Sequence, residues 1–149
     1  MSIADLFLDK QLLAYSEDRA KKREDFYTKA GADDVPLVLL VNENSASSSE
    51  ILSGGLQDLK RATVVGTTTY GKGVIQYVVE LSGEPTDGFQ FTMAQYFTPS
   101  GAAVHKIGIT PDVLSEMPEE LKSAYFELGD MTDPQLKDAW ETAVKLIEN

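Results

Sequence analysis

The hydrophobic residues in the middle of the chain predict a strand, a helix and a second strand, in that order. Residues 35–41 form an apolar run without alternation, which is typical of a strand covered on both faces. After the polar cluster 43–49, the apolar residues from Ile51 to Leu59 recur at helical spacing, and residues 62–69 again favour a strand. Because a unit of this kind normally makes a right-handed parallel crossover, we expect a sheet that is at least partly parallel.

Weaker patterns on the N-terminal side predict a short helix and a hairpin. Residues 3–8 are amphipathic at helical spacing, as at the end of a longer helix. Two β-prone runs, 12–15 and 26–28, flank the very polar stretch 16–25, and this arrangement fits a hairpin. The basic residues at its tip fit either a solvated turn or a peptide-binding patch.

The C-terminal half predicts two more strands and a closing helix. The strands are expected at 74–81 and 89–98, around a turn rich in Gly, Pro and Asp at 82–88. The helix is expected over 133–147, with Asp133 as its N-terminal cap. Its apolar face comprises Leu136, Ala139, Trp140, Ala143, Val144 and Ile147. We expect the tryptophan of this face to be a core anchor rather than a platform for a ligand.

Composition narrows the classes of function. The net charge of −11 repels phosphate backbones, so no nucleic-acid partner is predicted. The chain has no cysteine, one histidine, no ligand set at metal-binding spacing and no phosphate-binding glycine loop. Neither a metal nor any other cofactor is therefore predicted. No apolar run approaches the roughly 20 residues that cross a bilayer.

Length and element order indicate one α/β domain. The 149 residues, 42% of them hydrophobic, suffice for a single core of ordinary size. We expect a domain over 1–149 with a hairpin at 10–30, a core at 35–113 and a helical tail at 114–149. The one histidine, His105, lies in a proline-containing loop, where a structural or surface role is the expectation.

A serine cluster marks the predicted turn between the first central strand and its helix. Such a turn projects a hydroxyl above the sheet, and the free N–H groups of the helix start can stabilise an oxyanion. The alternative is that these serines only cap the helix, which is a common use of serine. The cluster consists of Ser45, Ser47, Ser48 and Ser49.

Lys72 is the second candidate for chemistry, because it stands between Gly71 and Gly73. A lysine has an ordinary pKa of about 10.4, so a lysine that acts as a base needs an apolar setting that disfavours its charge. Neighbouring valine and isoleucine residues could supply that setting, and the glycines would let the backbone approach closely. A solvent-exposed lysine in a glycine turn is the alternative.

These segments together resemble the carboxyl-terminal processing (tail-specific) peptidases. The segments S-A-S-S-S-E, L-Q-D, T-Y-G-K-G-V-I-Q, Y-F-T-P-S-G and G-I-T-P-D appear in the order of that family, and the match runs from about Ala4 to Leu146. The combination of the serine segment with G-K-G-x-x-Q favours catalytic ancestry over simple capping. The resemblance implies a ClpP/crotonase-like core with a mixed, largely parallel sheet flanked by helices.

The resemblance also implies a role for each of five residues. Ser47 would be the nucleophile, Lys72 its general base, and Gln76 the residue that orients the lysine amine. The backbone N–H of Ser48 would stabilise the oxyanion of an acyl-transfer reaction. Asp58 would support the site, although a helix-surface acid beside neighbouring basic residues explains it equally well.

The family pattern further implies what lies outside this chain. The family has a signal or membrane anchor, a PDZ domain and an N-P-G-G segment, and all three would lie upstream of residue 1. We therefore expect an N-terminally truncated core that is inactive by itself and self-associates through exposed apolar edges. The full-length protein would cleave protein or peptide substrates near their C-termini, in the periplasm or on the extracytoplasmic face of a bacterial envelope.

A non-catalytic alternative also fits the same fold. Crotonase-like binding or scaffold domains share this core without hydrolysing peptides, and a fold does not decide a function. The serine and the lysine at their family spacing favour the peptidase, because a binding domain has no need for both.

Overall fold

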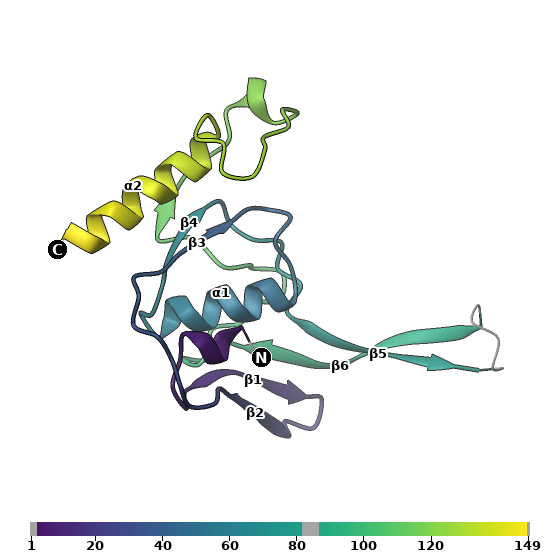
Figure 1. The fold of residues 1–149 in the computed structure, drawn as a ribbon. Coiled ribbons are helices and arrows are strands. Elements are labelled where there is room, and N and C mark those ends of the chain that lie inside the picture. The colour runs from purple at the N-terminus through teal and green to yellow at the C-terminus, as the bar shows by residue number, and fades with distance from the viewer. Residues whose placement is uncertain (1–2, 82–86, 149) are drawn as a thin grey trace.

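The strands form two separate sheets in a computed structural model that describes residues 3–81 and 87–148 (Figure 1). The larger sheet is antiparallel, in the order β2-β1-β6-β5, and the smaller is parallel, in the order β3-β4-β7. The antiparallel strands are β1 (Leu12–Asp18), β2 (Arg23–Tyr27), β5 (Val74–Glu80) and β6 (Gly88–Phe97). The parallel strands are β3 (Val38–Val41), β4 (Thr63–Gly66) and β7 (Val113–Leu114). The helices are α1 (Ser48–Asp58), α2 (Pro134–Glu148) and the single 3₁₀ turns η1 (Ala4–Leu6) and η2 (Glu119–Leu121).

The predicted parallel crossover is confirmed. β3 and β4 pair in parallel from Val38 opposite Thr63 to Val41 opposite Gly66, and α1 connects them. β7 adds to the other side of β4, also in parallel. β4 is the inner strand, and the two valines at its centre are fully buried. β3 lies at the edge of this sheet and Leu40 is 44% exposed, so the expectation that the run 35–41 is covered on both faces is wrong.

The expectation of one largely parallel sheet is wrong. The strands predicted at 74–81 and 89–98 are β5 and β6, which pair antiparallel, and β6 pairs antiparallel with β1. Most of the strands therefore belong to an antiparallel sheet. The reason is connectivity, because strands joined by a short turn can pair only in opposite directions, whereas parallel pairing needs a long crossover.

The helix α1 lies between the two sheets, packing on β1 and contacting β4 (Figure 1). Its Leu56 is completely buried and belongs to a core cluster with Leu13 of β1 and Ala4 of η1. Because the helix touches both sheets, its N-terminal end has a defined position relative to each. The remaining buried members of this cluster are Leu8 and Ala62.

The closing helix α2 is present, and its predicted cap is confirmed. Asp133 Oδ1 accepts N–H bonds from Gln135 at 2.9 Å and from Leu136 at 3.3 Å. The prediction that Trp140 anchors the core is wrong, because this residue is 61% exposed. The small parallel sheet covers only part of the apolar stripe of α2, so that Ala139 is buried and the outer members of the stripe face solvent.

The N-terminal hairpin extends further than the polar pattern predicted. Ser16 pairs with Glu24 and Glu17 with Arg23, although all four were expected to lie in the polar connection between the strands. Polar side chains are compatible with a strand when one face of the sheet meets water. At the tip, Lys21 pairs with Glu17 at 3.4 Å, and Arg23 pairs with Asp25 at 2.5 Å.

The turn predicted over 82–88 falls mostly outside the described residues, because the structure does not describe residues 82–86. Over the residues that are described, no helix has the length and apolar character to span a membrane.

Candidate active site

The turn between β3 and α1 holds Ser47 in an unusual backbone conformation. Its φ is +59° and its ψ is −116°, a region that residues with a side chain rarely adopt. Ser45 stabilises the turn, because its Oγ accepts the N–H of Asn42 at 3.1 Å and its own N–H donates to the carbonyl of Asn42 at 2.9 Å. Ser47 is the N-cap of α1, so it lies where the turn after β3 leads into the helix.

Glu50 is a completely buried acid directly behind this turn. Its Oε2 accepts the N–H of Ser47 at 2.9 Å and the N–H of Lys72 at 2.8 Å. Its Oε1 accepts the hydroxyl of Thr69 and the N–H of Gly71, both at 2.6 Å. One carboxylate thus joins two loops, one carrying Ser47 and the other Lys72, although more than 20 positions of sequence separate them.

The loop that carries Lys72 is ordered by its glycines and by hydrogen bonds from two directions. Gly71 has a φ of +86°, which favours glycine, and any side chain at Gly73 would collide with the backbone of His105. Thr69 Oγ1, besides donating to Glu50, accepts the N–H of Ile109 at 2.7 Å. The loop is therefore held both on α1 and on the segment after β6.

Tyr96 of β6 approaches the same two loops from the sheet. Its hydroxyl lies 3.0 Å from the carbonyl oxygen of Ser47 and 2.8 Å from that of Lys72, and can donate to either. The residue is 2% exposed and packs in a second core cluster with Val104 and Ile109. Burial raises the pKa of Tyr96 well above its ordinary value, and the negative charge of Glu50 raises it further, so the hydroxyl remains a donor.

The structure brings together the backbones of Ser47, Ser48 and Lys72. Ser48 is the first residue of α1, so its N–H has no partner within the helix and is available to a ligand. The side chain of Lys72 is not enclosed with these backbones, because the residue is exposed. The apolar setting expected around its amine is not present in this structure.

The other two predicted site residues lie elsewhere. Gln76 is in β5, directly after a bulge, and its Oε1 accepts a bond from Gln90 Nε2 at 3.0 Å. Asp58 is at the far end of α1, about 15 Å along the helix from Ser48. Its Oδ2 accepts the N–H of Ser100 at 2.7 Å, so it ties α1 to the turn after β6.

Glu50 and Tyr96 are not among the site residues predicted from the sequence. Glu50 follows Ser47 by three positions, and this S-x-x-E spacing is a capping-box pattern that could have indicated the bond to the N–H of Ser47. The bonds from Glu50 to the Lys72 loop have no signature in the local sequence. The contacts of Tyr96 have none either, because only the fold determines which groups a buried tyrosine hydroxyl meets.

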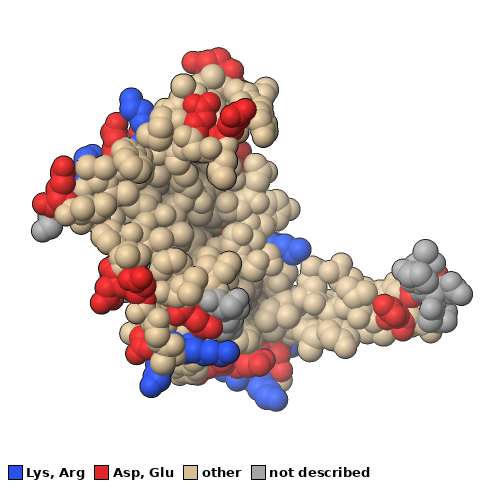
Figure 2. Space-filling model, in the orientation of Figure 1, with Lys and Arg blue, Asp and Glu red and all other residues tan. Residues whose placement is uncertain are grey.

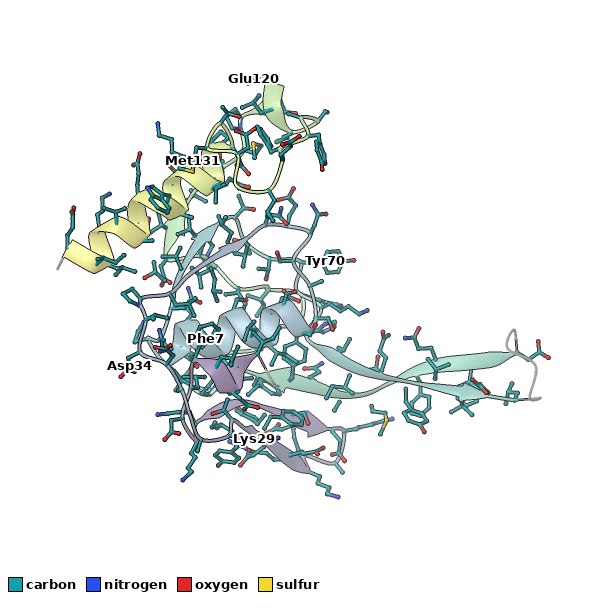
Figure 3. The ribbon with its side chains drawn as sticks, viewed as in Figure 1. Phe7, Lys29, Asp34, Tyr70, Glu120 and Met131 are labelled. Atoms are coloured by element: carbon teal, nitrogen blue, oxygen red, sulfur yellow. The ribbon has the colours of Figure 1, made fainter. Side chains whose placement is uncertain are left out.

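The surroundings of the site are partly apolar and partly open. Tyr70, 68% exposed, projects its ring outward from the Lys72 loop near the start of α1 (Figure 3). An apolar groove of about 310 Å³ adjoins the first turn of the helix. It is lined by Ile3, Ala4, Leu13, Ser48, Ser49, Ile51 and Leu52. Within the described ranges, no three histidine or acidic side chains are grouped so as to hold a metal ion.

Comparison with known proteins adds sequence relatives. The model of a family described as peptidase family S41 matches residues 1–115. A carboxy-terminal-processing protease of Bartonella bacilliformis is 41% identical over 137 residues, covering 87% of this chain and 31% of the relative. A carboxyl-terminal-processing protease of Synechocystis is 45% identical over 119 residues, covering 79% of this chain and 27% of the relative.

The fold is also found in a solved structure of a related protein. A photosystem II D1 C-terminal processing protease superposes with a TM-score of 0.73 at 37% identity, covering 92% of this chain and 34% of that one. It shares the mixture of antiparallel and parallel sheets. A lipoprotein from Streptococcus agalactiae superposes with a TM-score of 0.72 at only 14% identity, which shows the fold alone. The chain spans about a third of the length of the relatives that it matches.

Proposed function

Because this chain belongs to peptidase family S41, we propose that it is part of the catalytic core of a serine endopeptidase that cleaves proteins near their C-termini. Its relatives are carboxyl-terminal processing peptidases. The observation that supports the proposal most is that the turn of Ser47 and the loop of Lys72 are joined through one buried carboxylate. A proton can pass between a nucleophile and its base only when the two residues are close, and this carboxylate holds their backbone amides on one atom.

The proposed reaction is acyl transfer through Ser47. Its Oγ attacks the substrate carbonyl carbon while its proton moves to the neutral amine of Lys72, and the N–H of Ser48 donates to the oxyanion. The lysine then returns that proton to the leaving amine as the peptide bond breaks. Water hydrolyses the acyl-enzyme by the reverse route and restores the serine. In this scheme Gln76 orients the lysine amine, and Asp58 gives support from the end of α1.

The exposure of Lys72 agrees with a site completed by other segments. The relatives are about three times as long as this chain. We propose that the remainder of a full-length protein covers the lysine amine, excludes water from it and supplies a second oxyanion donor. Losing one such donor typically lowers kcat by about 10²–10³, so this chain alone would have little activity.

The test compares two variants of the full-length protein with matched controls. Ser47→Ala and Lys72→Ala are each expected to lower peptide cleavage by about 10³-fold or more, because each removes an essential proton-transfer partner. Ser123→Ala and Lys137→Ala change the same residue types at exposed positions and should leave cleavage unchanged. Circular dichroism establishes that each variant is folded. Undiminished turnover in folded Lys72→Ala would exclude the proposed dyad.

A non-catalytic binding or scaffold domain with a crotonase-like core is the second candidate. The exposure of Lys72 favours it, because a lysine that acts as a base needs an apolar setting, which this exposed residue lacks. A serine-directed fluorophosphonate probe separates the two functions. The peptidase requires labelling of the full-length protein that is lost in Ser47→Ala, whereas a binding domain would not be labelled.

We also propose that the full-length protein acts in the periplasm or on the extracytoplasmic face of a bacterial envelope. The support is the resemblance to the carboxyl-terminal processing family and the occurrence of relatives in bacteria. Added protease should digest the full-length protein in spheroplasts, in which the inner membrane is intact. Protection that persists until the membrane is lysed would contradict this location.

A further inference from the structure

We propose that Glu50 and Tyr96 are positioning residues that hold the backbones of Ser47 and Lys72 in one fixed relative arrangement. This inference rests on the proposed function, because it concerns the same serine and lysine. Neither residue faces the substrate side of the turn, since each is at least 98% buried. Each instead contacts both loops from within the protein.

Glu50 fixes the amide groups of both residues. A single atom, Oε2, accepts the N–H of Ser47 at 2.9 Å and the N–H of Lys72 at 2.8 Å, so that the two amides converge on one point. The other oxygen accepts from Thr69 and Gly71. In all four contacts an N–H or O–H group donates to an oxygen of Glu50. An ionised carboxylate can accept all four bonds, whereas a side-chain amide has only one oxygen that accepts. A glutamine at this position would direct its own N–H₂ group at two donors.

Tyr96 fixes the carbonyl groups of the same two residues. The carbonyl oxygens of Ser47 and Lys72 lie 3.0 Å and 2.8 Å from its hydroxyl, so they too converge on one atom. The N–H of Tyr96 donates to the carbonyl of Gly73 at 3.1 Å, which attaches β6 to the Lys72 loop a second time. Amide and carbonyl of both residues are thus held by one buried acid and one buried phenol.

The geometry has a consequence for the reaction. Ser47 has a positive φ, a strained conformation that persists only where the surroundings determine it. Glu50 and Tyr96 thus act as two clamps on the backbones of Ser47 and Lys72. If either clamp is lost, the turn can relax and the hydroxyl of Ser47 moves relative to Lys72. A displacement of about 1 Å can lower a rate by about 10²-fold. Substrate contacts outside the two loops would be unaffected, so kcat should fall while KM stays nearly constant.

The first test is Tyr96→Phe in the full-length protein. The ring keeps its packing and only the hydroxyl is lost, so the fold should survive. We expect kcat for a peptide substrate to fall about 10- to 100-fold with KM within about twofold of the wild type. The matched control is Tyr125→Phe, which removes a hydroxyl from a residue that is 90% exposed, and it should change neither constant.

The second test is Glu50→Gln, with Glu141→Gln at an exposed position as its control. A larger fall in kcat is expected, because two of the four hydrogen bonds are lost and the charge is removed. Thermal unfolding is measured in parallel. A folded variant of either residue with unchanged kcat would overturn the proposal, and so would a loss confined to KM.

Two further outcomes keep the inference separate from the function on which it rests. If Ser47→Ala retains full activity, the proposed function fails, whatever the clamp variants do. If Ser47→Ala is inactive and Tyr96→Phe is fully active, only the clamp fails. If neither Tyr96→Phe nor Glu50→Gln folds, amide hydrogen exchange in the wild-type protein tests the proposal instead. A clamp requires slow hydrogen exchange at the amides of Ser47 and Lys72, and exchange as fast as in exposed loops would overturn it.

Discussion

Ser47 and Asp58 show, at the two ends of α1, how single side chains hold the backbone around the site. Ser47 adopts a positive φ, and the buried Glu50, three residues later, helps to maintain it by accepting the N–H of Ser47. Asp58 accepts the N–H of Ser100 and thereby holds the turn that follows β6. Partial burial acts to raise the pKa of Asp58, but hydrogen bonds from Ser100 and Thr98 outweigh it and lower the pKa below its ordinary value.

The depressed pKa predicts how stability depends on acid. A carboxyl whose pKa is lowered by folding contributes stability above its ordinary pKa of about 3.9, and this stability is lost as the pH falls through the folded pKa. Asp58→Asn should lower the free energy of unfolding at pH 7 by up to about 1 kcal/mol, since the site is only partly buried. At pH 3 the difference from the wild type should shrink.

Urea unfolding at the two pH values measures this difference. Asp34→Asn is the control, because Asp34 is exposed, and it should unfold like the wild type at both. An equal loss for Asp58→Asn at pH 3 and pH 7 would mean that the carboxylate charge is not the cause.

At the scale of elements, the close approach of α1 to β1 depends on glycine. Gly54 and Gly55 lie inside α1, where glycine disfavours a helix by about 1 kcal/mol relative to alanine. Both are buried. A Cβ on Gly55 would collide with the carbonyl oxygen of Leu13 in β1, whereas one on Gly54 would meet first the end of the Ile109 side chain. The helix can therefore seat on the sheet only with glycine at position 55.

This difference predicts unequal effects of the same substitution at neighbouring positions. Gly55→Ala should destabilise the protein by about 1–3 kcal/mol, because the obstructing atom belongs to the backbone and the helix must move. Gly54→Ala should cost less than about 1 kcal/mol, since a side-chain end can shift and the helix gains propensity. Urea titration of both variants gives the two free energies, and equal losses would refute the argument.

At the scale of the whole molecule, the outer parts of β5 and β6 project as a two-stranded ribbon away from the rest of the molecule (Figure 1). The register sets Tyr77 opposite Phe91 and Val79 opposite Phe89, so these residues share one face, and Met93 lies at the bulge that follows Thr92. Exposure of Tyr77, Phe89, Phe91 and Met93 lies between 41% and 56%. On the side of the ribbon that Figure 2 shows, charged residues are few.

The ribbon supports the proposal that this chain associates with itself. β5 is an edge strand, so a second copy can pair with it antiparallel and make the two apolar faces continuous. Sedimentation equilibrium should show a concentration-dependent dimer, which Phe91→Gln weakens. Val78→Gln is the control, because Val78 alternates with Tyr77 and Val79 and lies on the opposite face. A monodisperse monomer at all concentrations would contradict the proposal.

Much of the local structure followed from patterns in the amino-acid sequence. The apolar runs of β3 and β4, the helical spacing of α1 and the cap at Asp133 depend on neighbouring residues, so short-range patterns suffice to predict them. The order of the serine and glycine-lysine motifs was likewise enough to indicate the family that the comparisons show.

The contacts between distant segments came only from the folded chain. The pairing of β6 with β1, the exposure of Trp140 and the convergence of Glu50 and Tyr96 on two loops each depend on which surfaces pack together. That choice is made by the summed free energy of many long-range contacts, to which no local pattern corresponds. For this reason the candidate site residues could be proposed from the sequence, whereas the groups that hold their backbones in place could not.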